Sequence, residues 1–136
     1  MGHIYSDISL ANARDPSLSA VTVSALVDTG ALHLCVPEKV ALQLKLPELE
    51  RRVVTVADGR SQEVPYVGPV QIRFANRQCM VGALVLGDQT LLGAIPIEDM
   101  DLVVRPARLA LEVNPASPNM AMSLAVGITS ARGAGR

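Results

Sequence analysis

The chain has 136 residues, which fits one domain, and 49% of them are hydrophobic, which is ample for a packed core. Its 12 basic and 13 acidic side chains give a formal net charge of −1 and form no long run of one sign, so we expect no nucleic-acid partner. We also expect no membrane contact, because no apolar run is long enough to span a bilayer and no secretion-signal pattern opens the chain.

Cys35 and Cys79 are the only cysteines, and neither has a histidine or cysteine neighbour at zinc-ligand spacing. We therefore predict no metal site and no cofactor. Two buried, reduced thiols in a cytoplasmic protein are the favoured interpretation, and a disulfide between them is the alternative.

Short strands separated by turn signals dominate the pattern, with little helix. In the first part of the chain, strands are expected over residues 4–11, 18–27 and 32–36, with a turn at 12–17. A helix is expected over residues 37–44. Pro37 suits its first position, and Val40 and Leu44 lie one turn apart on a face that can be buried.

Asp58-Gly59 lies between strand-like residues 52–57 and 62–67, which predicts a hairpin with a type I′ turn. Val70, Ile72 and Phe74 then alternate with other residues, so this strand has one buried face. Further elements follow in order: strands at 79–86 and 90–93, helical turns at 96–101, strands at 102–104 and 109–113, a loop at 114–119 and an apolar stretch at 120–128. We expect one domain over residues 1–128 and a flexible tail over 129–136.

Asp28-Thr29-Gly30 follows directly on the buried strand that ends at Val27. By itself the tripeptide also fits an ordinary turn, because aspartate caps turns and glycine permits a sharp change of direction. Its surroundings favour a functional loop. A Val-rich strand leads into it, and an apolar strand followed by a helix leads out.

Residues 26–31, Leu-Val-Asp-Thr-Gly-Ala, resemble the active-site loop of retropepsin-like aspartic proteases. Leu91-Leu92-Gly93 with residues 94–97 resembles the apolar-apolar-Gly element before that family's C-terminal helix, and Asp58-Gly59 lies where the family has its flap. The resemblance covers approximately residues 21–113. It implies an all-β fold, one half of the acid-protease closed β-barrel with one or two short helices, that assembles as a two-fold dimer.

The resemblance also implies the site residues. Asp28, Thr29 and Gly30 would form the catalytic loop of an aspartic endopeptidase, with Asp28 from each of two copies sharing one proton and activating a water. Thr29 would hydrogen-bond across the two-fold axis. The residues expected to bind an extended peptide substrate are Ala31, Ala57, Asp58, Gly59 and Arg60.

Two positions depart from the retroviral pattern. Leu32 stands where an acidic residue is typical, and Ala94 stands where an arginine is typical, so both members of a charge pair are missing together and neither charge is orphaned. We interpret His33 as a core or dimer-facing residue rather than a catalyst. Residues 4–11 and 120–126 are the expected terminal strands of the dimer interface.

Two alternatives remain open. One is a catalytically silent dimer of the same fold that binds extended peptides or serves as a dimerisation module. The other is an unrelated small β-barrel with Asp28 on an exposed turn away from any symmetry axis.

Overall fold

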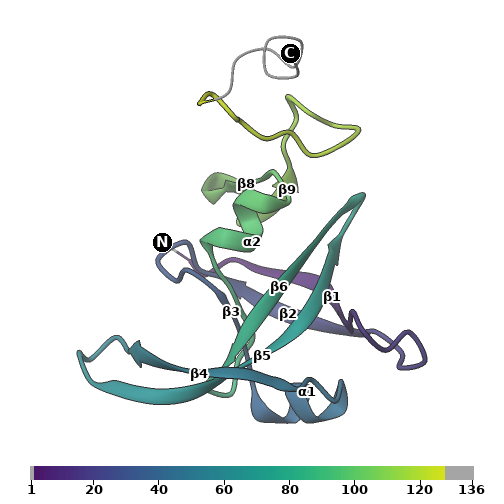
Figure 1. Ribbon diagram of the computed structural model, residues 1–136. Helices are drawn as coiled ribbons and strands as arrows, with labels where there is room; N and C mark the ends of the chain where they lie inside the picture. The colour runs from purple at the N-terminus through teal and green to yellow at the C-terminus, as the bar shows by residue number, and fades with distance from the viewer. Residues whose placement is uncertain (1, 128–136) are drawn as a thin grey trace.

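A computed structural model describes residues 2–127, and short strands dominate it, as the alternating pattern predicts (Figure 1). Its strands are β1 (Tyr5–Asn12), β2 (Val21–Val27), β3 (Leu34–Val36), β4 (Glu48–Thr55), β5 (Ser61–Phe74), β6 (Arg77–Val85), β7 (Leu91–Leu92), β8 (Leu102–Arg105) and β9 (Ala110–Val113). The helical segments are α1 (Glu38–Gln43), α2 (Ala94–Asp99) and the 3₁₀ turn η1 (Pro106–Arg108).

The main sheet closes on itself because β1 pairs with β2 along one edge and with β5 along the other. Around the ring the order is β1-β2-β7-β3-β6-β5, and β4 lies outside it as a partner of β5. Strand twist and stagger allow such closure, and inward-facing side chains then meet in one core. The predicted all-β, barrel-like fold with two short helices is therefore confirmed.

The core is aliphatic, because the chain has only two tyrosines, one phenylalanine and no tryptophan. Leu10 on β1 lies beside Ile72 on β5, and both are 0% exposed. Val70 is also fully buried, so the alternation predicted for this strand is confirmed. Burying each such side chain contributes about 1.5–3 kcal/mol, which allows a core without large rings.

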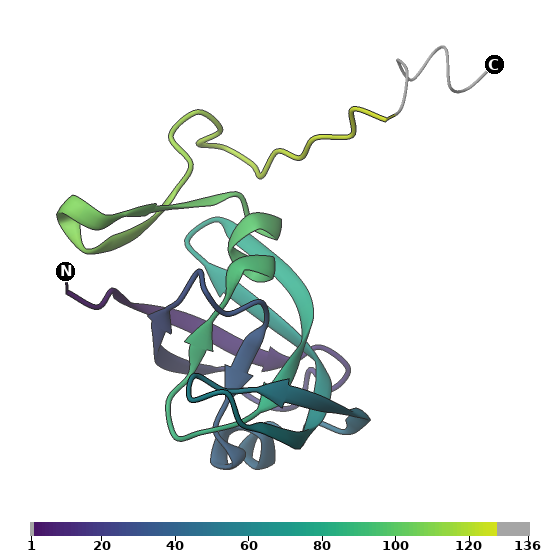
Figure 2. The same ribbon diagram turned by 90° about the vertical axis from the view of Figure 1, so that its left-hand side faces the viewer.

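α1 lies at the end of the barrel opposite α2 (Figures 1 and 2). Val40, Ala41 and Leu44 are buried, and Asn12 donates a hydrogen bond of 3.0 Å to the Leu44 carbonyl oxygen, which ties the end of α1 to β1. Pro37 has an extended backbone, with φ −65° and ψ 155°. It therefore precedes the helix instead of occupying its first position.

Several strand boundaries differ from those predicted, and β4 begins at Glu48 instead of residue 52. β2 begins at Val21 and not at residue 18, because the Leu18 amide donates to the Asp15 carbonyl oxygen and the preceding turn is longer. β5 is one strand of 14 residues where two were expected. Its pairing with β6 shifts register between Val67 and Val70, so a bulge accommodates Gly68 and Pro69 without ending the strand.

β8 and β9 form a separate two-stranded sheet beside α2, far from the β4–β5 hairpin (Figures 1 and 2). Residues 120–127 have no strand, although a terminal strand was expected at 120–126. The large apolar side chains of this segment are exposed: Met120, Met122, Leu124 and Val126. The tail predicted at residues 129–136 lies outside the described residues.

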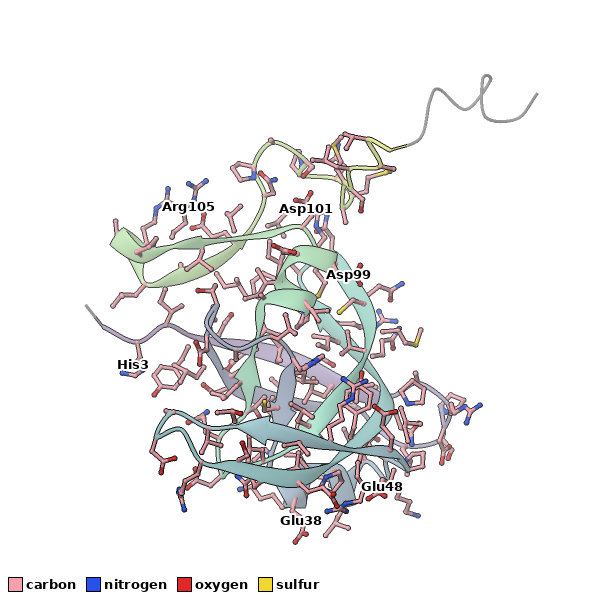
Figure 3. All side chains as sticks on the ribbon, turned by 60° about the vertical axis from the view of Figure 1, so that its left-hand side comes forward. His3, Glu38, Glu48, Asp99, Asp101 and Arg105 are labelled. Atoms are coloured by element: carbon pink, nitrogen blue, oxygen red, sulfur yellow. The ribbon has the colours of Figure 1, made fainter. Side chains whose placement is uncertain are left out.

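The Asp101 carboxylate holds this C-terminal segment against the start of β8 (Figure 3). It accepts hydrogen bonds from the Ser117 hydroxyl, from Asn114 Nδ2 at 3.0 Å and from the Met122 amide at 3.0 Å. These bonds, in that order of importance, lower the pKa of Asp101 to about 2. A charged carboxylate therefore fixes the path of a segment that has no regular structure.

Candidate active site

The backbone of Asp28 is fixed on both sides. β2 and β7 pair in parallel through Leu26↔Leu91 and Val27↔Leu92, and the Asp28 amide then donates to the Leu92 carbonyl oxygen at 3.0 Å. The Asp28 carbonyl oxygen accepts from the Ala31 amide at 3.1 Å, which closes the turn. The aspartate predicted at a strand end thus lies at the start of a tight loop held by β7.

The Asp28 carboxylate lies inside that loop. The Gly30 amide donates to Asp28 Oδ1 at 3.0 Å, and this hydrogen bond fixes the side chain. Gly30 does not have positive φ, so the loop does not use glycine for a left-handed backbone. Glycine avoids crowding instead, because a Cβ at this position would lie 3.2 Å from Asp28 Oδ1 and would press on the carboxylate. Asp28 is half-buried, whereas Thr29 and Gly30 are exposed.

Gly93 allows two segments to cross directly behind the loop. A Cβ there would lie 2.4 Å from the His33 carbonyl oxygen and 2.8 Å from that of Ala31. Next to it, the Ala94 amide donates to the Ala31 oxygen at 2.8 Å, and the Ile95 amide donates to the Leu32 oxygen at 2.9 Å. The apolar-apolar-Gly element singled out in the sequence therefore supports the Asp28 loop from behind.

A groove of about 580 Å³ opens beside Asp28. Asp28 is the only carboxylate among the described residues that line it. The wall is otherwise mainly apolar, and its lining residues are Asp28, Gly30, Ala31, Leu32, His33, Cys35, Arg52, Val53, Val54, Thr55, Val56, Ala57, Leu84, Leu86 and Leu91. Three separate parts of the chain thus enclose one groove: the Asp28 loop with β3, the β4 side of the hairpin, and the segment from β6 to β7.

The β4–β5 hairpin lines one side of this groove and projects from the barrel (Figure 1). Its turn differs from the type I′ turn predicted, because only Gly59, with φ 87°, has positive φ. The Gly59 amide donates to the Val56 oxygen and the Val56 amide to the Arg60 oxygen, both at 2.9 Å. This is a three-residue loop with a glycine bulge, the common alternative when Asp58 keeps negative φ.

The structure separates the residues expected to bind substrate into two groups. Ala31 and Ala57 line the groove, whereas the hairpin tip does not reach its wall. At the tip, the Arg60 Nε lies 2.7 Å from Asp58 Oδ2, so the two charges neutralise one another in solvent. A role for Asp58, Gly59 or Arg60 in binding therefore requires the hairpin to move.

Several groove residues were not identified from the sequence. Leu84 and Leu86 enter it from the end of β6, and Arg52 enters from β4. Cys35 is a free, buried thiol whose pKa is raised by burial and then by the nearby charge of Asp28. Periodicity marks such residues as buried or exposed, but it does not say which strand each one faces.

Among residues 2–127, no cluster of three or more His, Cys, Asp or Glu side chains is placed to bind a metal ion. None of the helices described in this range has the length and hydropathy needed to cross a bilayer.

The sequence matches one protein family over residues 15–98, described as gag-polyprotein putative aspartyl protease. The matched region contains the Asp28 loop, the β4–β5 hairpin and the Leu91-Leu92-Gly93 element. A comparison with curated proteins found no match. Because the match covers more than half of the 136 residues and its fold and loop are those described above, the chain belongs to this retroviral-type aspartyl protease family.

Proposed function

We propose that the chain is an aspartic endopeptidase that works as a two-fold homodimer, with Asp28 of each copy in one shared site. The observation that carries this proposal is the single carboxylate of the groove. Among the described lining residues only Asp28 is acidic, and aspartic-protease chemistry needs two. The exposure of Thr29 and Gly30 supports it, since a second copy can approach the loop there.

In this mechanism the two Asp28 carboxyl groups share one proton, because like charges a few Å apart do not both ionise. The ionised carboxylate removes a proton from a water, whose oxygen attacks the carbonyl carbon of the scissile bond. The protonated carboxyl group donates to the carbonyl oxygen, and a proton is then passed to the amine nitrogen as the C–N bond breaks. The Gly30 amide holds Asp28 Oδ1 in place for these transfers.

Thr29 has a positioning role in the proposal. Its exposure beside Asp28 lets it hydrogen-bond to the partner copy across the axis and hold both loops rigid. The exposed apolar residues of 120–126 and strand β1 are the proposed remainder of the interface. Burial of these side chains against a second copy would remove a substantial apolar surface from water.

The proposed substrate is an extended peptide with apolar side chains near the scissile bond. Leu32, Leu84 and Leu86 supply apolar walls for such side chains. β4 pairs only with β5 in the described sheet, so its other edge is available to a peptide backbone. Closure of the hairpin would bring Ala57 and the tip residues 58–60 onto the substrate and exclude water. Two free, buried thiols support a cytoplasmic location.

The test is cleavage of a mixed peptide library by the parent chain and by Asp28→Asn, with Asp88→Asn as the matched control on an exposed turn. Asp28→Asn keeps the size of the side chain but cannot hold the base, so we expect cleavage to fall by at least about 10²-fold. Asp88→Asn is expected to cleave at the parent rate. Cleavage retained in Asp28→Asn would refute the assignment. Dimerisation and peptide binding without cleavage in the parent would establish the silent-module alternative.

A further inference from the structure

Three side chains connect the β4–β5 hairpin to the loop that carries Asp28. We call them the hinge cluster: Arg52 on β4, Tyr66 on β5, and His33 between Asp28 and β3. Arg52 Cζ lies 3.7 Å from the centre of the Tyr66 ring, over its face. Arg52 Nη1 lies 3.4 Å from His33 Nε2. The rings of His33 and Tyr66 meet edge to face, with centroids 6.0 Å apart at 68°.

Two members of the hinge cluster are anchored to the barrel. The Tyr66 ring lies directly on the backbone of β6, because a Cβ on Gly82 would come within 2.1 Å of Tyr66 Cζ. His33 is anchored through its own backbone, whose oxygen lies 2.4 Å from the Cβ position of Gly93. His33 cannot shift without disturbing the crossing behind the Asp28 loop, and Tyr66 cannot move towards β6.

Arg52 is the member on β4, the hairpin strand that lines the groove. Its Nε donates to Glu50 Oε2 at 2.5 Å, and this bond orients the guanidinium towards the rings of Tyr66 and His33. Arginine has only donors, so its contact with His33 Nε2 requires a neutral imidazole with its proton on Nδ1. A protonated imidazole has no lone pair to offer and places a second positive charge beside the guanidinium, which does not lose its own proton.

We propose that the hinge cluster holds the β4–β5 hairpin over the groove while His33 is neutral, and that protonation of His33 releases it. The proposal concerns movement of the hairpin and does not depend on peptide hydrolysis. It assigns to His33 a positioning role that acts through Arg52, where the sequence indicated only a core or dimer-facing histidine.

The charges around His33 determine how readily it is protonated. Arg52 from β4 opposes its protonation, and Glu50 partly offsets that charge. Asp28 lines the same groove, where a negative charge would favour protonation of His33, and Tyr66 from β5 presents its ring to the His33 ring edge to face. β6 and α2 contribute residues without titratable groups to the neighbouring wall: Met80, Val81, Gly82, Ile95 and Pro96.

The pKa of His33 is lowered from 6.5, first by burial and then by Arg52. A group whose pKa is depressed in the closed state binds more protons in the open state. The closed hairpin is therefore fully favoured at pH values above the ordinary histidine pKa. This preference is lost as the pH falls through the lowered pKa of His33. Release is expected on the acidic side of neutrality.

The experiment is amide hydrogen exchange from about pH 7.5 to about pH 4.5, which spans the ordinary histidine pKa. Protection factors corrected for intrinsic exchange are compared between hairpin residues 53–60 and the paired strands β1 and β2. In the parent we expect hairpin protection to fall several-fold on acidification while β1 and β2 stay constant. In His33→Phe, which keeps a ring edge against Tyr66 and binds no proton, we expect no such fall.

A second pair of variants separates the hinge cluster from general effects on β4. Arg52→Lys keeps the charge and loses the planar contact, so hairpin protection is expected to be low throughout the pH range. Arg51→Lys is the matched control, because Arg51 pairs with Glu48 and Glu63 away from the cluster. Asp28→Asn is expected to retain a fall in hairpin protection on acidification, displaced to lower pH, because the variant removes a charge that favours protonation of His33 but not the proton acceptor itself.

Three results would overturn the proposal. One is hairpin protection in the parent that does not change between the two pH values. Another is His33→Phe responding as the parent does. The third is Arg51→Lys loosening the hairpin as much as Arg52→Lys.

Discussion

Replacing Gly93 by alanine tests whether the crossing behind the Asp28 loop is as tight as the structure indicates. The new Cβ would lie 2.4 Å from the His33 oxygen, 2.7 Å from the Leu32 carbonyl carbon and 2.8 Å from the Ala31 oxygen. All three neighbours are backbone atoms, so none can move aside as a flexible side chain does. The chain must separate at this point.

The expected cost follows from what that separation breaks. Crowding a packed site costs about 1–3 kcal/mol. The two hydrogen bonds beside the crossing, from the Ala94 and Ile95 amides, are at 2.8 Å and 2.9 Å and would lengthen together. Each contributes about 1 kcal/mol net. We therefore expect Gly93→Ala to lower the free energy of unfolding by about 3–5 kcal/mol, a large part of the total for a domain of this size.

The assay is urea unfolding at one fixed protein concentration, because a dimer's stability depends on concentration. Gly87→Ala is the matched control. Gly87 has φ 71° with no atom near its Cβ position, so alanine there meets backbone strain of about 1–2 kcal/mol without crowding. If Gly93→Ala cost no more than Gly87→Ala, the close crossing would be refuted as the support of the Asp28 loop.

Three further predictions follow from the site and the C-terminal segment. The cleavage rate is expected to have a bell-shaped pH profile, falling at alkaline pH together with dimer affinity, as both facing Asp28 carboxylates ionise and repel. Asp101→Asn is expected to raise protease sensitivity over residues 114–122. In the parent, the segment is fully bound above the ordinary aspartate pKa, and binding is lost as pH falls through the lowered Asp101 pKa of about 2. Cys35 and Cys79 are expected to react slowly with a thiol reagent until the protein unfolds, because burial raises both pKa values, that of Cys79 to about 12.

Each of these three has an outcome that contradicts it. A cleavage rate that keeps rising at alkaline pH excludes a shared proton. Protease sensitivity that changes equally in Asp101→Asn and in the exposed control Asp88→Asn excludes a specific role for Asp101. Native thiols that react as fast as those of the unfolded chain show that Cys35 and Cys79 are accessible.

The sequence predicts most strands and the position of Asp28, because both rest on local signals. The alternation through Val70 and Ile72 marks a half-buried strand, and the apolar run ending at Val27 marks the place where the loop begins. Asp58-Gly59 marks a hairpin whatever its turn type. These signals involve residues two to four positions apart, so each of them can be recognised within a single segment of the sequence.

The groove and the hinge cluster depend on contacts between distant segments, and local signals do not contain those. Whether Arg52 meets Tyr66 depends on the register between β4 and β5, in which Glu50 pairs with Tyr66. Whether Cys35 faces Asp28 depends on the placing of β3 between β6 and β7. The sequence also does not predict that β5 is continuous. Gly68 and Pro69 usually indicate the end of a strand, and only the pairing with β6 shows that they form a bulge within one strand.

The parallel pairing of β2 with β7 has a consequence for the order in which the protein folds. Leu26 pairs with Leu91, so the loop around Asp28 is completed only after most of the barrel's chain has been brought together. Closing so long a loop costs conformational entropy before other contacts offset that cost, so such pairings form slowly. During synthesis, Asp28 therefore emerges before its supporting segment and has no fixed geometry until the segment through Gly93 has followed. The candidate active site therefore stays incomplete in chains that have been synthesised only in part.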